Sequence, residues 1–390
     1  MQFGSTPGEA RFRQEVRSWL AANAPTTKRP DDGPAMRDFD LAWQRRKFDA
    51  GWAGIAWPRE HGGRGLSLVE QVIWYEECAH ARAPGVGALN IAVDHAGPTI
   101  MLHGTPEQKA AHLPRILRGE VLWCQGFSEP GAGSDLAGLR LKGTVEGDEI
   151  VVTGQKAWSS HAHLADFQEL LIRTGPTTPR HAGITWAICD MRAPGITVRP
   201  VPTMANNHHF CDVFYDNVRI PLSNVVGGVG QGWRMAMSTL SLERGSLAVG
   251  RSADLARFIE DLVAMARTRP LAGATTPAIG DGEFAARLAG LRADCLALRA
   301  MVYDTVAAAI AGAPPGTDGV MDYLAYAELL QRAREAGMEL LGAEALDLAG
   351  PSADWVRGYL SDRMYVIAGG SAEVRRNIIA ERGLGLPRSG

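Results

Sequence analysis

The order of local sequence patterns restricts this chain to few folds. Up to about residue 122, apolar residues recur at helical spacing, as in LAWQRRKFDAGW and LVEQVIWYEECAHA. Short stretches rich in Val, Ile, Thr and aromatic residues follow, such as EIVVTG and GITWAICDM, before long helical segments return. We therefore expect an α+β protein with an N-terminal α-helical domain (1–122), a central antiparallel β-barrel or sandwich (123–232) and a C-terminal helical bundle (233–390).

Composition excludes several classes of protein. Charged residues make up 21 % of the 390 residues and hydrophobic ones 46 %, which is typical of a packed globular protein. The net charge of −3 and the absence of long Lys/Arg runs argue against nucleic-acid and membrane surfaces. Five widely spaced cysteines form no C-x-x-C pair, so neither a disulfide framework nor a zinc site is expected. With no signal peptide and no apolar run of about 18 residues, we expect a cytoplasmic protein that binds a small molecule.

The first helix has a start signal of its own. Thr6 precedes Pro7, and Glu9 stands three residues after Thr6. This arrangement is typical of a capping box with proline at the first helical position. We expect the helix to begin at Pro7.

Two stretches at the start of the β region have residue types suited to ligand binding. WCQGFSEPGAGSDLAG (123–138) combines glycines, serines and an aspartate, so its backbone N–H groups can face an anion such as a phosphate. GQKAWSS (154–160) offers a flat indole beside two hydroxyls, which suits a planar heterocycle. From residue types alone, an ordinary irregular loop and a core tryptophan followed by exposed serines explain these stretches as well.

Four segments together carry a resemblance to a known family. FSEPGAGSDLAG, GDEIVVTGQKAWSS, GWRMAMSTLSLERG and IAGGSAEVRRNIIAERGLGLP resemble the acyl-CoA dehydrogenase superfamily in order and spacing over nearly the whole chain. The resemblance implies that family's fold, which ends in a four-helix bundle, and FAD as cofactor. It further implies that Phe127 and Ser128 line the isoalloxazine, that Gly133 and Ser134 contact the pyrophosphate, and that Trp158 packs on the ring with Ser160 near N5.

The resemblance also indicates the catalytic base. Medium-chain enzymes carry a glutamate before Gly in a C-terminal E-G-T motif, where this chain has Gly369 and no carboxylate. Isovaleryl-CoA and long-chain enzymes instead place the base in a sequence like L-S-L-E-R, which points to Glu243. We expect Glu243 to remove the α-proton and the Gly369 N–H to polarise the thioester carbonyl. The alternative is that Glu243 and Arg244 are merely charged neighbours on a solvated helix face.

Other positions depart from the family pattern or carry less weight. The arginine that normally reaches the partner subunit's FAD is missing, with Arg267 or Arg269 as substitutes, and Glu339 replaces a glutamine expected near the dinucleotide. His161 and His163 are interpreted as residues of a solvated loop rather than metal ligands, and His208 and His209 as surface histidines. No metal site is expected.

The resemblance therefore implies an FAD-dependent acyl-CoA dehydrogenase that produces a trans-2-enoyl-CoA. The implied partners are an acyl-CoA substrate, electron-transfer flavoprotein as electron acceptor, and other subunits in a homodimer, a homotetramer or a heterotetramer with a homologous chain. Two alternatives stay open: a flavin oxidase or monooxygenase on the same fold, and a flavin-incomplete structural subunit of a heteromeric enzyme. The sequence does not identify the acyl group.

Overall fold

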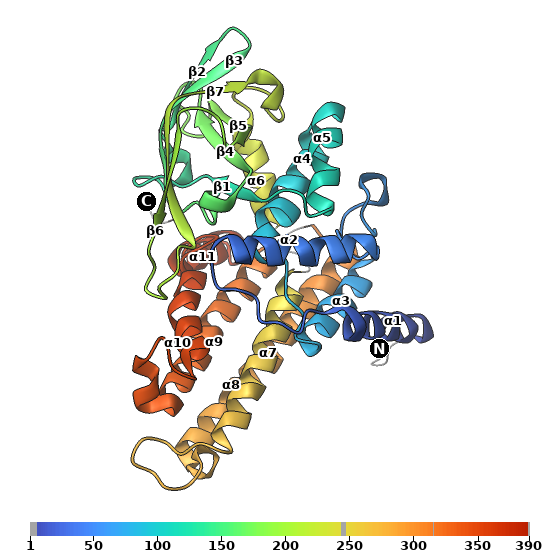
Figure 1. Ribbon diagram of the computed structural model, residues 1–390, viewed down its shortest axis with the longest axis vertical. Coiled ribbons are helices and arrows are strands. Elements are labelled where there is room, and N and C mark those ends of the chain that lie inside the picture. Colours follow the sequence, from blue (N-terminus) through green and yellow to red (C-terminus); the bar gives the residue numbers. More distant parts are fainter. Residues whose placement is uncertain (1–5, 243–246, 315, 389–390) are drawn as a thin grey trace.

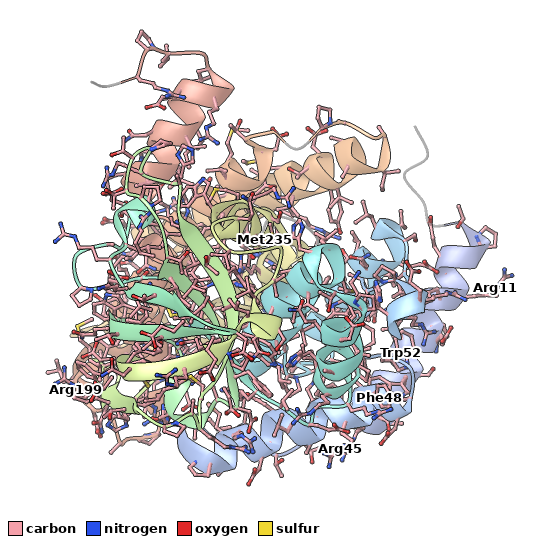
Figure 2. All side chains as sticks on the ribbon, turned by 90° about the horizontal axis from the view of Figure 1, so that it is seen from above. Arg11, Arg45, Phe48, Trp52, Arg199 and Met235 are labelled. Carbon is pink, nitrogen blue, oxygen red and sulfur yellow. The ribbon has the colours of Figure 1, made fainter. Side chains whose placement is uncertain are left out.

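A computed structural model describes residues 6–242, 247–314 and 316–388. A sheet lies at one end of the molecule, the long C-terminal helices lie at the other, and helix α2 crosses between them (Figure 1). From above, Arg11 and Arg199 project outward from the rim, whereas Met235 is fully buried (Figure 2). This is the predicted order of a helical, a β and a second helical region.

The N-terminal helices enclose a cluster of tryptophans. Thr6 caps α1 in a full capping box with Glu9, as predicted. Trp19 stacks on Trp43 with ring centroids 5.6 Å apart, and Trp52 stacks on Trp74 at 4.8 Å. The helices are α1 (Pro7–Asn23), α2 (Gly33–Asp49), α3 (Leu68–His80), the π-helix η3 (Ile91–Ala96), α4 (Gly97–His103) and α5 (Pro106–Leu117).

The described strands form one seven-stranded sheet with the order β1-β4-β2-β3-β7-β6, and β5 pairs with β4. Most pairs are antiparallel, as predicted, but β1 runs parallel to β4 over Trp123–Gly126. The strands are β1 (Trp123–Gly126), β2 (Lys142–Glu146), β3 (Glu149–Lys156), β4 (Phe167–Arg173), β5 (Ile184–Asp190), β6 (Ile196–Val201) and β7 (Phe210–Pro221). β3 lies between β2 and β7, and its C-terminal end pairs with β7 as far as Lys156.

Long helices form the C-terminal region. Helices α7, α8 and α9 share a buried apolar core, against which Tyr75 of α3 also packs. The helices are α6 (Gly232–Leu242), α7 (Leu247–Ala266), α8 (Gly282–Ile310), α9 (Asp318–Leu341), α10 (Ala353–Ser361) and α11 (Ala372–Ile378). Because α3 packs on α7, the first and third regions are joined along a long contact.

Candidate active site

The loop after β1 is built to leave backbone donors free. Glu129 and Ala132 exchange two backbone hydrogen bonds of 3.0 Å, which close a tight turn. Gly133 and Ser134 follow and are exposed, and a Cβ added at Gly133 would meet no atom within 4 Å. Among the described residues, none accepts a hydrogen bond from the N–H of Gly133 or Ser134. Such N–H groups suit an anion.

The structure brings this loop beside the end of β3. The Ala157 N–H donates to the carbonyl oxygen of Ser128 at 3.0 Å. Phe127 is buried and Ser128 is half-buried. The two segments that the sequence singles out, 123–138 and 154–160, therefore meet in space.

Trp158 presents an exposed indole at this junction. Its side chain is 61 % exposed, and its edge contacts Phe210 with ring centroids 5.7 Å apart. Its φ of 60° is a left-handed conformation that costs a residue with a side chain about 1–2 kcal/mol. Ser159 fixes that backbone, because it exchanges two hydrogen bonds with Cys211, at 2.9 and 3.1 Å. The alternative of a core tryptophan is excluded.

A buried ion pair holds the loop to the strand. Lys156 is fully buried and donates to the carbonyl of Phe127 at 2.9 Å and to Glu129 Oε1 at 2.8 Å. The Glu129 carboxylate also accepts the N–H groups of Arg140 and Leu141 at 2.7 and 2.8 Å. Burial lowers the pKa of Lys156 to about 8, and Glu129 opposes that shift. Sequence analysis missed this pair.

Gly369 lies in an exposed turn between the 3-10 helix η9 (Asp362–Val366) and α11. Its φ is 67°, a conformation that favours glycine. Buried Arg375 of α11 holds the turn from within, because its guanidinium donates to the carbonyls of Tyr365 and Ala368. No described residue accepts a hydrogen bond from the Gly369 N–H. Arg375 is a positioning residue for this turn that sequence analysis did not single out.

Glu243, the predicted base, lies outside the described residues. The helices on either side of it, α6 and α7, are described up to Leu242 and from Leu247. The role of Glu243 stays a prediction from sequence.

The positions that depart from the family pattern are paired with charges of opposite sign. Arg269 donates to both carboxylate oxygens of Glu344 at 2.9 Å, while Arg267 is exposed. Glu339 forms an ion pair with Arg287. That guanidinium offsets the negative charge that Glu339 would otherwise present to a dinucleotide.

The solvated-loop prediction for the histidines is wrong for His161. It is 7 % exposed because its N–H bonds the carbonyl of His209 and the two rings lie 4.3 Å apart. His163 is half-buried beside Cys211 and Asp32. His208 is exposed as predicted, whereas His209 is only half-exposed. In the described part of the chain, no group of three or more His, Cys, Asp or Glu side chains can hold a metal ion.

Burial of His161 predicts a pH-dependent stability. Burial lowers the pKa of His161 to about 3, below its ordinary 6.5, so the unfolded chain binds more protons between these values. The contribution of the neutral, buried His161 to the free energy of unfolding is complete above pH 6.5. It is lost as pH falls, and the loss reaches about 2 kcal/mol at pH 5. His161 has a φ of 56°, which asparagine tolerates. We expect the free energy of unfolding of H161N to fall by about 2 kcal/mol less between pH 7 and pH 5 than that of the wild type. Urea unfolding at both pH values measures this, and equal losses would contradict it.

The residues present suit an FAD molecule. The free N–H groups of Gly133 and Ser134 match the charge of a diphosphate, and the exposed Trp158 ring matches a planar ring system. Ser159 Oγ is buried and has no hydrogen-bond partner among the described residues. A left-handed tryptophan turned toward solvent is otherwise an unfavourable arrangement, which indicates function rather than packing.

Comparison with known proteins gives the family. Profiles described as the acyl-CoA dehydrogenase N-terminal, middle and C-terminal domains match residues 6–120, 124–218 and 230–384. The chain belongs to the acyl-CoA dehydrogenase family. It is an enzyme of the acyl-CoA dehydrogenase class, and the family uses FAD. The predicted family, fold class and cofactor are confirmed.

Several relatives match over nearly their whole length. Acyl-CoA dehydrogenase IpdE1 of Mycobacterium tuberculosis is 39 % identical, with 97 % of both chains covered. Mitochondrial isovaleryl-CoA dehydrogenase of Bos taurus is 27 % identical over 96 % of this chain and 88 % of its own. Among solved structures, the Tcur3481-Tcur3483 steroid ACAD gives a TM-score of 0.87 at 30 % identity, covering 100 % of both chains. The ChsE4-ChsE5 complex from Mycobacterium tuberculosis gives a TM-score of 0.83 at 31 % identity, and 100 % of both chains is covered.

Within the described ranges, none of the helices combines the length and apolar character needed to cross a bilayer.

Proposed function

We propose that this acyl-CoA dehydrogenase removes the α-proton of a thioester with Glu243 and delivers the β-hydrogen to FAD, leaving a trans-2-enoyl-CoA. The observation that carries this proposal is the junction of the two loops, where Trp158 is exposed beside free backbone donors. Bound FAD supplies the hydride acceptor. The Gly133 and Ser134 N–H groups would hold its diphosphate, while Phe127, Trp158 and Ser160 would face its ring.

The chain's own groups then have separate tasks. A carboxylate at Glu243 accepts the α-proton, and the Gly369 N–H, free of partners among the described residues, donates to the thioester carbonyl oxygen as negative charge develops there. Arg375 keeps that N–H in position by bonding the preceding carbonyls. Electron-transfer flavoprotein is the proposed electron acceptor.

The relatives favour an acyl group that bears rings. One similar solved structure is described as a steroid ACAD, and the chain aligns with all of it. We extend that substrate class to this chain: a thioester whose acyl group carries a fused or single alicyclic ring. The assembly we propose is an oligomer, either of this chain alone or with a homologous chain.

Anaerobic flavin bleaching tests the reaction. The purified yellow protein is mixed without oxygen with ring-bearing and straight-chain acyl-CoA thioesters, and flavin absorbance near roughly 450 nm is followed. We expect bleaching with a ring-bearing thioester and formation of the enoyl product. Bleaching by none of them would refute the proposal. Hydrogen peroxide formed at the rate of turnover in air would favour the oxidase alternative, in which oxygen reoxidises the flavin. A monooxygenase, by contrast, has no need for Glu243.

A second candidate function is that of a flavin-incomplete subunit. It is favoured by the missing arginine motif and by two similar structures that are two-protein complexes. Under this candidate, the chain expressed alone is colourless and becomes yellow when it is co-expressed with a homologous chain. A yellow protein that turns over thioesters without a second chain would exclude it.

A further inference from the structure

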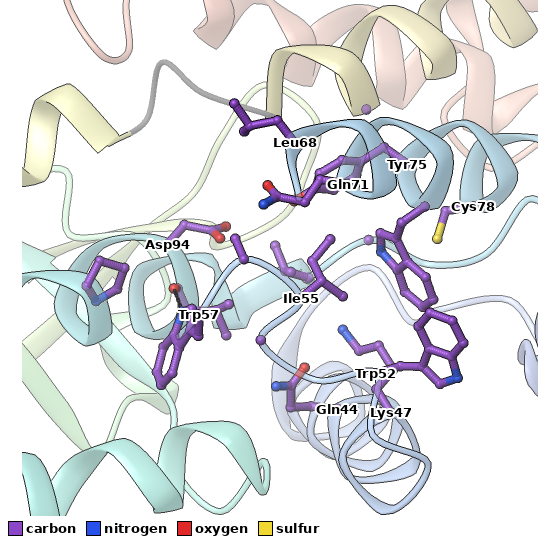
Figure 3. A pocket seen from close by; sticks show the side chains of 18 of the residues that line it. Gln44, Lys47, Trp52, Ile55, Trp57, Leu68, Gln71, Tyr75, Cys78 and Asp94 are labelled. Carbon is purple, nitrogen blue, oxygen red and sulfur yellow. Dashed lines mark hydrogen bonds between the residues drawn. The ribbon is translucent and has the colours of Figure 1, made fainter. Parts of the chain in front are cut away.

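A cavity of about 640 Å³ lies between the N-terminal helices and α7. Its walls are mostly apolar and aromatic, with Trp52, Trp57, Trp74 and Tyr75 among the lining residues (Figure 3). Its size is that of a pocket for a drug-sized ligand. Of the described residues that the sequence singles out as site residues, none lines it.

One wall of the cavity is attached to the strand that carries the cofactor loop. Val93 and Asp94 of η3 line the cavity, and the Val93 carbonyl accepts a hydrogen bond of 2.9 Å from Trp57 Nε1. The next residue, His95, contacts Gln125 of β1 through Nδ1 at 3.3 Å. Phe127, just beyond β1, belongs to the same buried cluster as Trp57 and Val93. The cavity therefore lies beside the part of the fold that carries the cofactor loop.

Lys47 of α2 is the unusual residue of the cavity. It is 7 % exposed, and its ammonium points into the cavity (Figure 3). Its Nζ lies 5.8 Å from the centroid of the Trp43 ring. No described residue accepts a hydrogen bond from Nζ. A buried ammonium without such bonds costs several kcal/mol, so a ligand that accepts them gains affinity.

The charges around Lys47 indicate what kind of acceptor fits. Titratable groups face the cavity from four elements: Cys78 on α3, Asp94 on η3, Asp254 on α7, and Glu60 and His61 on the segment after Trp57. Asp40, also on α2, is already bound by Arg29 through two bonds of 2.6 Å. An anionic tail would be repelled by the carboxylates that line the cavity, of which Asp254 is already paired with Arg257 at 3.6 Å. An uncharged oxygen avoids that repulsion and still accepts from Nζ.

The walls indicate the shape of the acyl group. Trp52 and Trp74 lie stacked, with 17° between their planes, and line the cavity together. Flat aromatic surfaces bury much apolar area of a rigid ring, which loses little conformational entropy on binding. A flexible chain would lose more.

We propose that this cavity binds the distal part of a ring-bearing acyl group and that Lys47 Nζ donates a hydrogen bond to a ketone or hydroxyl oxygen on it. The inference rests on the proposed function, because it takes the thioester end to lie at the cofactor loop. Lys47 is thus a specificity-determining residue, and it takes no part in proton or hydride transfer.

Three matched thioesters test the proposal: 3-(4-oxocyclohexyl)propanoyl-CoA, 3-cyclohexylpropanoyl-CoA and 3-(4-carboxycyclohexyl)propanoyl-CoA. For the wild-type holoenzyme we expect kcat/KM for the oxo compound to exceed that for the unsubstituted one by about tenfold or more. The carboxycyclohexyl compound should have the lowest kcat/KM of the three. In K47M the tenfold preference should vanish while kcat/KM for the unsubstituted ring stays within about threefold, and K142M, which removes an exposed lysine on β2, should behave as wild type.

The dependence of KM on pH and the dissociation constants distinguish a hydrogen bond from Lys47 to the ligand from a purely structural role of Lys47. Burial lowers the pKa of Lys47 to about 8, and Cys78, Asp94 and Asp40 oppose that shift. The wild-type KM for the oxo compound should therefore rise above about pH 8, with no such rise in K47M. Quenching of the cavity tryptophans gives dissociation constants without turnover. If K47M still prefers the oxo compound about tenfold, or if the wild type prefers the carboxycyclohexyl compound, the inference about Lys47 is wrong and the proposed function is unaffected. If the thioesters bind but never bleach the flavin, the proposed function is wrong.

Discussion

Replacing Glu243 with glutamine should lower kcat by about 10²–10⁴-fold while FAD stays bound. Glutamine keeps the shape and hydrogen-bonding capacity of the side chain but cannot accept the α-proton. The hydride cannot leave the β-carbon unless that proton is removed, so single-turnover flavin bleaching should slow by the same factor. Stopped-flow absorbance under anaerobic conditions measures it.

A matched variant separates the loss of the base from a loss of charge. Glu260 of α7 is exposed and pairs with Arg292 through two bonds of 2.7 and 2.8 Å. E260Q removes a surface carboxylate with no proposed role in the chemistry, so we expect bleaching within about twofold of wild type. If E243Q also bleached at the wild-type rate, the base would have to be another residue, and the assignment by the L-S-L-E-R motif would be wrong.

Local patterns were sufficient for the fold. The capping box at Thr6 predicted the first helical residue, and strands such as β5 were predictable because a short apolar run is bounded by turn residues. The parallel pairing of β1 with β4 was not predicted, because four residues carry too little pattern to show which strand they join or in which direction.

The candidate site was predictable only in part. The Gly-rich loop and Trp158 were found because their residue types suggest ligand contacts. Lys47 and Lys156 were not, since a lysine in a polar helix or near a strand end looks like a surface residue until burial is known. The same limit explains the wrong prediction for His161, whose burial depends on the distant His209.

Of these missed residues, Lys156 has the largest expected effect on folding. K156M removes the cation of a buried pair and leaves the Glu129 carboxylate, among the described residues, with hydrogen bonds from the two backbone N–H groups of Arg140 and Leu141. Removing one partner of a buried ion pair costs about 3–5 kcal/mol. We expect a loss of that size in the free energy of unfolding in urea, together with weaker FAD binding, because the Phe127 carbonyl loses its anchor.

The double variant E129Q/K156M shows whether the charge itself is responsible. Glutamine carries no charge, and its single carbonyl oxygen still accepts one of the two backbone hydrogen bonds from positions 140 and 141, so the double variant should recover part of the stability that K156M loses. If the lysine stem acted only through packing, the losses in the free energy of unfolding caused by the two substitutions should instead add.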